Sequence, residues 1–369
     1  MTLTRLEREL RTYVRTYQEY NASACAELDA TPTALEFHRE YVAQNRPVVL
    51  RGQGYRDGVP ALARWSDAYL VDAMQDRQVD VSVDPTGNAD SIVDGHFVEP
   101  ASVKMTMSDL FERLRRNDEE DDVEGRGPVW YAQSQSGNLS DEYAPLLDDV
   151  GTEGPVWARE ALGESPDVAN VWIGGRRSKT SLHKDPYENI YLVVRGTKEF
   201  ILFPPSEAYC LHERTYPHAT WSYSPSGDPA FTLVPTVPPV RVPWIPIDPT
   251  VAESSSSSSS ELYPRYRFAR PMRVEVHAGD MLYLPSLWFH YVSQSPRHFH
   301  DDDDEEGGQG VQGVRATIAV NWWFDMKFDG AAFAANELNR NLIRALDDAA
   351  AADDDDSCGG RGGRDDARR

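Results

Sequence analysis

Short segments with the composition of β-strands, separated by turns, dominate the second half of this chain. The segments are rich in β-branched and aromatic residues, and Gly196 and Gly279 lie in two of the turns between them. The segments are 168–174, 187–194, 198–203, 273–277, 281–284 and 316–324. A regular series of short strands is typical of a β-barrel or a two-sheet sandwich. We therefore predict a mainly β fold, with a hairpin at 194–198.

Helices are predicted around this β region. Residues 3–20 have apolar side chains at helical spacing, and a second helix is expected to begin near Thr33. Further helices are predicted at 65–74, 107–114 and 331–346, and further strands at 46–52, 79–83 and 129–134. Ser108 is the expected N-cap of the helix at 107–114.

The pattern divides the chain of 369 residues into three parts. Residues 1–32 form an N-terminal helical segment, and residues 33–346 form one large domain. The tail at 347–369 lacks the apolar residues needed for packing and is expected to be disordered. Low-complexity insertions are expected near 117–126, 252–262 and 297–313. They separate predicted elements, so the β core is expected to remain intact.

Charge and cysteine content exclude several classes of function. The formal net charge is −23, which disfavours binding to a phosphate backbone. The acidic runs are either solvated loops or a surface that attracts a basic protein substrate. The 3 cysteines form no CxxC pair, which argues against a zinc finger and a disulfide framework. Without an apolar leader or span, we expect no membrane association and a cytoplasmic or nuclear location.

A His-x-Asp pair and a distant histidine indicate a metal site. His183 and Asp185 directly precede the predicted strand at 187–194, and His290 follows about a hundred residues later. Residues two apart on a strand point to the same face, so both side chains can reach one ion. Two histidines and one carboxylate form the facial triad of non-haem Fe(II) oxygenases.

The bare spacing occurs elsewhere in the chain, so its context decides. His300 and Asp302 have the same spacing but lie in an acidic tract without a strand pattern. His38 and Glu40 are a near match in a helix-like segment. We interpret neither pair as a metal site.

Four further residues could serve a keto-acid cosubstrate that chelates the metal. Lys198 follows the predicted hairpin turn and would lie beside the His-x-Asp strand, although it could equally be an exposed strand lysine. Thr180 could offer a hydroxyl group or be an ordinary strand residue. Asn189 and Tyr191 share the face of His183 if the strand is regular, or else are satisfied polar residues of the core.

Several motifs, in order along the chain, resemble the JmjC family. They comprise Thr180-x-x-His183-x-Asp185, Asn189, Lys198, Gly279-Asp280, Trp288-x-His290 and Ala319-Val320-Asn321. JmjC proteins are Fe(II)- and 2-oxoglutarate-dependent oxygenases built on a double-stranded β-helix, a cupin-like jelly roll. The resemblance therefore implies that core with flanking helices, Fe(II) as cofactor, and 2-oxoglutarate and O2 as cosubstrates.

The resemblance also assigns roles to residues. His183, Asp185 and His290 would bind the iron. Lys198, Thr180 and Tyr131 would hold the far carboxylate of 2-oxoglutarate. Nearer the metal, the cosubstrate would be lined by Asn189, Tyr191 and Asn321.

A longer likeness, through Tyr187-Glu188-Asn189, Val242-Pro243-Trp244 and Asn321-Trp322-Trp323, is to small JmjC lysyl hydroxylases. These act on developmentally regulated GTP-binding proteins, which are the implied protein substrate. The alternatives are a histone lysine demethylase, a histone-tail endopeptidase and a non-enzymatic cupin-like scaffold. The N-terminal helix could form a homodimer or pack on its own domain.

Overall fold

The computed structural model describes residues 4–119, 127–135, 137–252, 259–295 and 316–359. Most of the three expected low-complexity insertions and the end of the tail lie outside these residues. Two elements reach into the insertions: helix α6 (Met107–Glu119) extends to Glu119, and helix α10 spans Ser259–Leu262.

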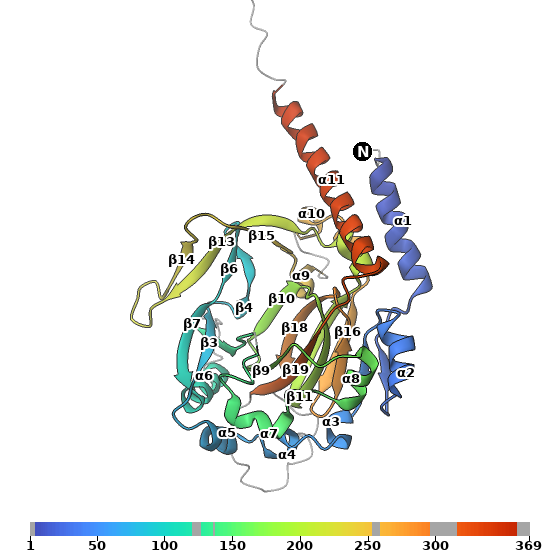
Figure 1. The fold of residues 1–369 in the computed structure, drawn as a ribbon. Helices are drawn as coiled ribbons and strands as arrows, with labels where there is room; N and C mark the ends of the chain where they lie inside the picture. Colours follow the sequence, from blue (N-terminus) through green and yellow to red (C-terminus); the bar gives the residue numbers. More distant parts are fainter. Residues whose placement is uncertain (1–3, 120–126, 136, 253–258, 296–315, 360–369) are drawn as a thin grey trace, which may run out of the picture.

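Two sheets form the core of the fold (Figure 1). In order, the nine-stranded sheet contains β1 (Ala26–Leu28), β2 (Val48–Leu50), β17 (Met281–Leu284), β11 (Tyr187–Arg195), β19 (Thr317–Asp325), β9 (Val168–Gly174), β8 (Val129–Ala132), β3 (Gln78–Asp84) and β7 (Ala101–Thr106). The smaller sheet contains β16 (Met272–His277), β12 (Thr197–Phe203), β18 (Phe289–Ser295), β10 (Lys179–His183) and β4 (Asn88–Ala89). Buried side chains from both sheets, including Tyr191 of β11 and Phe200 of β12, pack in one cluster. The predicted two-sheet, mainly β core is confirmed.

The turns at Gly196 and Gly279 carry the chain from one sheet to the other. The predicted hairpin at 194–198 is therefore wrong, because β11 and β12 lie in different sheets and do not pair. Gly196 has a φ of 78°, and a Cβ added there would lie 2.6 Å from the Thr317 hydroxyl oxygen. Glycine permits both this backbone conformation and the close approach. Since the local pattern of a sheet-to-sheet turn and a hairpin turn is the same, the sequence did not separate them.

The helices cover the outside of the sheets. Helix α1 (Arg5–Tyr20) is capped by Thr4 and buries Leu10 and Val14 against Ile343 of α11 (Ala331–Gly359). Figure 1 shows α1 and α11 side by side at one end of the molecule. Helix α1 thus packs on its own chain, and its role in a homodimer stays a prediction.

The remaining helices are short. They are α2 (Ala34–Phe37), the π-helix His38–Val42, α3 (Gln53–Arg56), α4 (Ala61–Arg64), α5 (Asp67–Met74), η2 (Ala144–Leu146), α7 (Leu147–Val150), α8 (Val156–Leu162), η3 (Pro205–Cys210), α9 (Pro249–Ala252) and η4 (Tyr266–Phe268). None of the helices in the described ranges is both long and apolar enough to cross a membrane.

Two helix boundaries differ from the prediction. The N-cap of α6 is Thr106, whose hydroxyl accepts a hydrogen bond from the Asp109 N–H group at 3.2 Å, and Ser108 is already within the helix. Helix α11 continues beyond residue 346 to Gly359, into the segment expected to be disordered. The run Ala349–Ala352 explains this extension, because alanine has the highest intrinsic helix propensity.

A third sheet, which the sequence did not predict, borders the smaller sheet of the core. It contains β14 (Phe231–Pro235), β13 (Arg214–Tyr223), β6 (His96–Glu99) and β5 (Ser91–Val93), with β15 (Arg241–Trp244) paired to β13. Its strands alternate poorly and are half exposed, as the pattern of β13 shows. The register between β13 and β6 is parallel and joins segments more than a hundred residues apart.

Asp280 fixes the end of β2 to the crossover between β16 and β17. Its carboxylate accepts hydrogen bonds from Arg51 Nη1 at 2.6 Å, the Gly52 N–H at 2.7 Å and the His277 N–H at 3.2 Å. The side chain is 6% exposed. A buried carboxylate with three donors stabilises the fold only while all of its partners are present.

We expect Asp280→Ala to lower the free energy of unfolding by about 3 kcal/mol, because it leaves the Arg51 guanidinium partly buried without this carboxylate. Urea denaturation followed by circular dichroism measures the change. Glu27→Ala is the matched control, because Glu27 also binds Arg51 but is 58% exposed. Its expected effect is below about 1 kcal/mol. Equal effects of the two changes would contradict the assignment.

Candidate metal centre

Three side chains predicted as metal ligands meet at the end of the smaller sheet. His183 of β10 and His290 of β18 are directly opposed in the antiparallel register. Asp185 Oδ2 lies 3.6 Å from His183 Nε2 and 3.6 Å from His290 Nε2. One ligand atom from each residue lies within 4.8 Å of the other two. The predicted convergence of these residues is confirmed.

The position of Asp185 has a different cause from the one predicted. Strand β10 ends at His183, and Asp185 lies in the turn before β11. The alternation of side chains along one strand therefore does not place it. A backbone hydrogen bond from the Leu287 N–H to the Asp185 carbonyl, 2.9 Å long, holds the turn against the loop that precedes β18.

Both imidazole rings are oriented by backbone carbonyl groups. His183 Nδ1 lies 2.8 Å from the Ser181 carbonyl oxygen, and His290 Nδ1 lies 3.0 Å from that of Trp288. In neutral rings these Nδ1 atoms carry the proton, which leaves each Nε2 lone pair toward Asp185. Two neutral imidazoles and one carboxylate are the donor set that non-haem Fe(II) prefers. The residues therefore fit a ferrous ion.

The electrostatics favour one negative charge at the centre. Burial opposes ionisation of Asp185, but the two histidines outweigh it and hold its pKa below the usual value. Burial also opposes protonation of His183, but Asp185 raises its pKa above the usual value. For His290, burial and the neighbouring His183 lower the pKa to about 4. A metal cation would displace any proton from His183 Nε2 and take the place of its positive charge beside Asp185.

Glu188 of β11 positions the loop that leads into β18. Its carboxylate accepts hydrogen bonds from the Ser286 hydroxyl at 2.8 Å and the Tyr283 hydroxyl at 2.7 Å. The next residue, Leu287, has a φ of 68° and donates its N–H to Asp185. A left-handed backbone at a branched residue is rare and is kept only by surrounding contacts. Glu188 thus connects the larger sheet to the metal ligands.

An inner cavity beside the triad brings together five of the six residues predicted to bind the cosubstrate. Its lining includes Tyr131, Thr180, Asn189, Tyr191 and Asn321. Lys198 lies behind Tyr131, with its Nζ atom 3.1 Å from the Tyr131 hydroxyl oxygen.

Lys198 is 1% exposed, and burial lowers its pKa to about 7. Within the part of the chain that the structure describes, no carboxylate accompanies its ammonium group. The position of Lys198 is not due to hairpin pairing, because β12 pairs with β16 and β18.

Asn321 lies in a hydrogen-bond network inside the larger sheet. Its Oδ1 atom accepts from Trp172 Nε1 at 2.8 Å, and its Nδ2 atom donates to Asn189 Oδ1 at 3.1 Å. This contact occupies the Asn189 Oδ1 atom and leaves the Asn189 Nδ2 group for the cavity. Asn189 and Tyr191 therefore face the cavity from β11, and not from the strand that carries His183.

Of the near match formed by His38 and Glu40, His38 has a structural role. His38 Nδ1 lies 3.0 Å from the Ala161 carbonyl oxygen, which ties the π-helix to α8. His300 and Asp302 lie outside the described residues.

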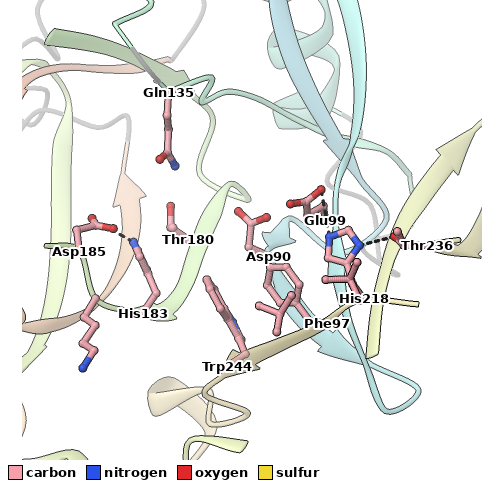
Figure 2. Close-up of a pocket in the computed structure, with 13 residues that line it drawn as sticks. Asp90, Phe97, Glu99, Gln135, Thr180, His183, Asp185, His218, Thr236 and Trp244 are labelled. Carbon is pink, nitrogen blue, oxygen red and sulfur yellow. Dashed lines mark hydrogen bonds and ion pairs between the residues drawn. The ribbon is translucent and has the colours of Figure 1, made fainter. Parts of the chain in front are cut away.

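Sequence reasoning missed an outer cleft of about 560 Å³ that opens beside the metal ligands (Figure 2). The ring of Trp244 is parallel to that of His183, at an interplanar angle of 5° and a centroid distance of 6.1 Å. Asp90, Glu99 and His218 also line the cleft. Trp244 occurred in a motif that carried the resemblance, but nothing in the local sequence marked Asp90, Glu99 or His218.

A two-sheet β-helix with a His-x-Asp pair and a distant histidine defines the cupin-type class of non-haem iron proteins. Residues 34–330 match the family model of the cupin-like domain. The chain belongs to this cupin-like family of JmjC proteins.

Three relatives from different kingdoms match most of the chain. The "Bifunctional peptidase and (3S)-lysyl hydroxylase JMJD7" of Homo sapiens is 38% identical over 305 residues, 82% of this chain and 84% of the relative. "JmjC domain-containing protein E" of Dictyostelium discoideum is 35% identical, over 80% of this chain and 83% of the relative. "Lysine-specific demethylase JMJ32" of Arabidopsis thaliana is 37% identical, over 82% and 81%.

We expect Asp185→Ala to weaken divalent-metal binding by more than about a hundredfold, because it removes the charged ligand. Isothermal titration with Mn(II), an ion of similar preference, measures the affinity without turnover. Asp329→Ala is the control, because Asp329 is exposed and does not belong to the group of candidate ligands. Unchanged metal affinity in a folded Asp185→Ala protein would contradict the site.

Proposed function

We propose that this protein is an Fe(II)- and 2-oxoglutarate-dependent hydroxylase that oxidises a C–H bond of a lysine side chain. The observation that carries the proposal is the buried Lys198 ammonium behind Tyr131 of the inner cavity, without a carboxylate partner among the described residues. Buried charges are normally paired. A dicarboxylate that chelates the metal at one end supplies the missing anion at the other.

The far carboxylate of 2-oxoglutarate would meet three donors of this chain. Lys198 supplies the charge, and Tyr131 and Thr180 supply hydroxyl groups. The Tyr131 hydroxyl already bonds to Lys198. Burial raises the pKa of Tyr131 strongly, and its hydrogen bond with Thr180 opposes this rise. Charge-assisted hydrogen bonds of this kind are among the strongest in proteins.

The residues of the centre would have different roles in this reaction. His183, Asp185 and His290 would hold the metal, and Asn189, with Asn321 behind it, would orient the chelating end of the cosubstrate. Fe(II), when bound, would activate O2. One oxygen atom would be used to convert 2-oxoglutarate into succinate and CO2, and the other would be inserted into the C–H bond of the substrate. Buried aromatic residues, Tyr191 and Phe200 among them, line the same cavity and limit the access of water.

Lysine as the target rests on the relatives. The human relative is named a (3S)-lysyl hydroxylase, and the carboxylates of the outer cleft suit a cationic side chain. We propose a developmentally regulated GTP-binding protein as the substrate that the sequence resemblance implies.

Incubation of such a GTP-binding protein with enzyme, Fe(II), 2-oxoglutarate and O2 is expected to add the mass of one oxygen atom on a lysine. Intact-mass and fragment-ion spectrometry detect the addition and locate the residue. Enzyme carrying Asp185→Ala is the control. Absence of product from folded, iron-loaded enzyme across these GTP-binding proteins would contradict the proposed substrate.

Different products distinguish the other activities. The Arabidopsis relative is named a demethylase, which would release formaldehyde from a methylated lysine peptide. The human relative is also named a peptidase, an activity that would cleave a peptide bond of its substrate. A scaffold without activity would produce no succinate. Since the donor set of the triad is complete, we favour an enzyme over a scaffold.

We expect the affinity for 2-oxoglutarate to fall above about pH 7, because the carboxylate binds the ammonium form of Lys198, whose pKa is lowered to about 7. The decline is at most about tenfold per pH unit. Lys198→Met should weaken binding by more than about a hundredfold and remove this pH dependence. Titration calorimetry with the Mn(II) protein measures both.

Lys198→Met is expected to weaken 2-oxoglutarate binding but to stabilise the ligand-free protein. With its pKa lowered on folding, Lys198 destabilises the ligand-free protein fully below pH 7 and progressively less as pH rises. Lys198→Met should therefore raise the midpoint of thermal unfolding most at low pH. Lys327→Met, at an exposed ion pair with Glu164, is the matched control for both measurements. A pH-independent difference in stability would contradict the buried charge.

A further inference from the structure

The outer cleft contains a carboxylate for which the proposed chemistry at the metal has no use. Asp90 lies between β4 and β5 and has a φ of 56°. Its backbone carbonyl accepts a hydrogen bond from the Ser181 hydroxyl of β10, which fixes it two residues from His183. Figure 2 shows the Asp90 carboxylate in the cleft, with Thr180 between it and Asp185. A left-handed backbone at a non-glycine residue is often found at functional sites.

The Asp90 carboxylate has no hydrogen-bond or ion-pair partner in the described part of the chain. Burial raises its pKa to about 6, although the neighbouring His183 opposes this rise. The other non-ligand carboxylate in the cleft is different. Glu99 is 50% exposed, and its Oε2 atom lies 3.4 Å from His218 Nε2. Asp90 is therefore the group whose charge is least compensated.

Aromatic rings form the wall beside Asp90. The centroids of the Trp244 and Phe97 rings are 4.4 Å apart, and Trp244 is also parallel to His183. The Trp244 Nε1–H donates to the Ser181 hydroxyl oxygen at 3.2 Å, which fixes the indole ring. The wall is thus a rigid apolar surface that runs from the metal ligands to the carboxylate. Such a surface suits a chain of methylene groups that ends in a cation.

We propose that Asp90, with Trp244 and Phe97, is the subsite that binds the side chain of the substrate lysine, with its primary ammonium group on Asp90. The identity of the reaction rests on the proposed function, whereas the cation subsite rests on the cleft. An ammonium group on Asp90 would lie on the far side of Thr180 from Asp185 (Figure 2) and so would not contact the metal. The atoms nearest the metal are then carbons of the lysine side chain or backbone, and not the nitrogen, which favours C-hydroxylation over N-demethylation.

The test compares two heptapeptide libraries that differ at the central residue, which is lysine in one and norleucine, its neutral analogue without the terminal ammonium group, in the other. Both bind to full-length protein with Mn(II) and N-oxalylglycine, so that no turnover occurs, and fluorescence anisotropy measures binding. We expect the wild type to bind the lysine library at least about tenfold more tightly. Asp90→Asn should abolish that preference, and asparagine accepts the left-handed backbone equally well.

Two further variants sharpen the comparison. Asp94→Asn removes an exposed carboxylate from the turn between β5 and β6 and should keep the full preference. Glu99→Gln should reduce the preference less than Asp90→Asn does, because Glu99 is half exposed and its Oε2 atom already lies 3.4 Å from His218 Nε2. Equal binding of the two libraries to the wild type, no binding of the lysine library, or a preference that survives Asp90→Asn would overturn the subsite.

The outcomes separate this inference from the proposed function. A preference for lysine that depends on Asp90, without hydroxylated product from any GTP-binding protein, supports the subsite and removes the proposed reaction. Hydroxylation of lysine by an enzyme whose binding is indifferent to Asp90 supports the reaction and removes the subsite.

Discussion

The antiparallel pairing of β10 with β18 is the constraint on which the metal centre depends. It places His183 directly opposite His290 although they are 107 positions apart in the sequence, and the carbonyl two residues before each histidine fixes its ring. A shift of one residue in this register would turn one imidazole to the opposite face of the sheet. The buried pairing of β12 with β18 on the other side makes such a shift costly, because every pair from Thr197 to Phe203 would change with it.

The larger sheet positions the third ligand, Asp185, which the pairing of β10 with β18 in the smaller sheet does not. Asp185 lies beyond the end of β10, so its position depends on Leu287 and, through Ser286, on Glu188 of the larger sheet. The three ligands are thus held by two sheets that meet at one turn. Metal affinity and folding stability are coupled in such an arrangement, because the ion stabilises the junction that the loop and the carboxylate form.

The sequence predicted most of the core strands and all three ligands, since each depends on local composition or on a motif. It failed where long-range contacts decide. The turn at Gly196 has the composition of a hairpin, yet burial between two sheets makes it a crossover. The half-exposed strand β13 has no clear alternation, and its partner β6 is remote in sequence. Asp90 was missed for the same reason, because its neighbour Ser181 is 91 positions away.

The two cavities beside the triad contain groups of opposite charge, and this difference would decide which proposed ligand binds in each cavity. The inner cavity is backed by Lys198, which has no nearby carboxylate among the described residues, so it favours a dianion. The outer cleft is lined by Asp90 and Glu99 and also by Lys184, whose Nζ atom lies 5.0 Å from the centroid of the Phe289 ring, so the cleft favours a cation at its Asp90 end. At short range in a partly buried site such charges discriminate by several kilocalories per mole, roughly. The proposed cosubstrate and the proposed lysine side chain would therefore approach one metal from two sides, and Thr180, which lines both cavities, lies where they would meet.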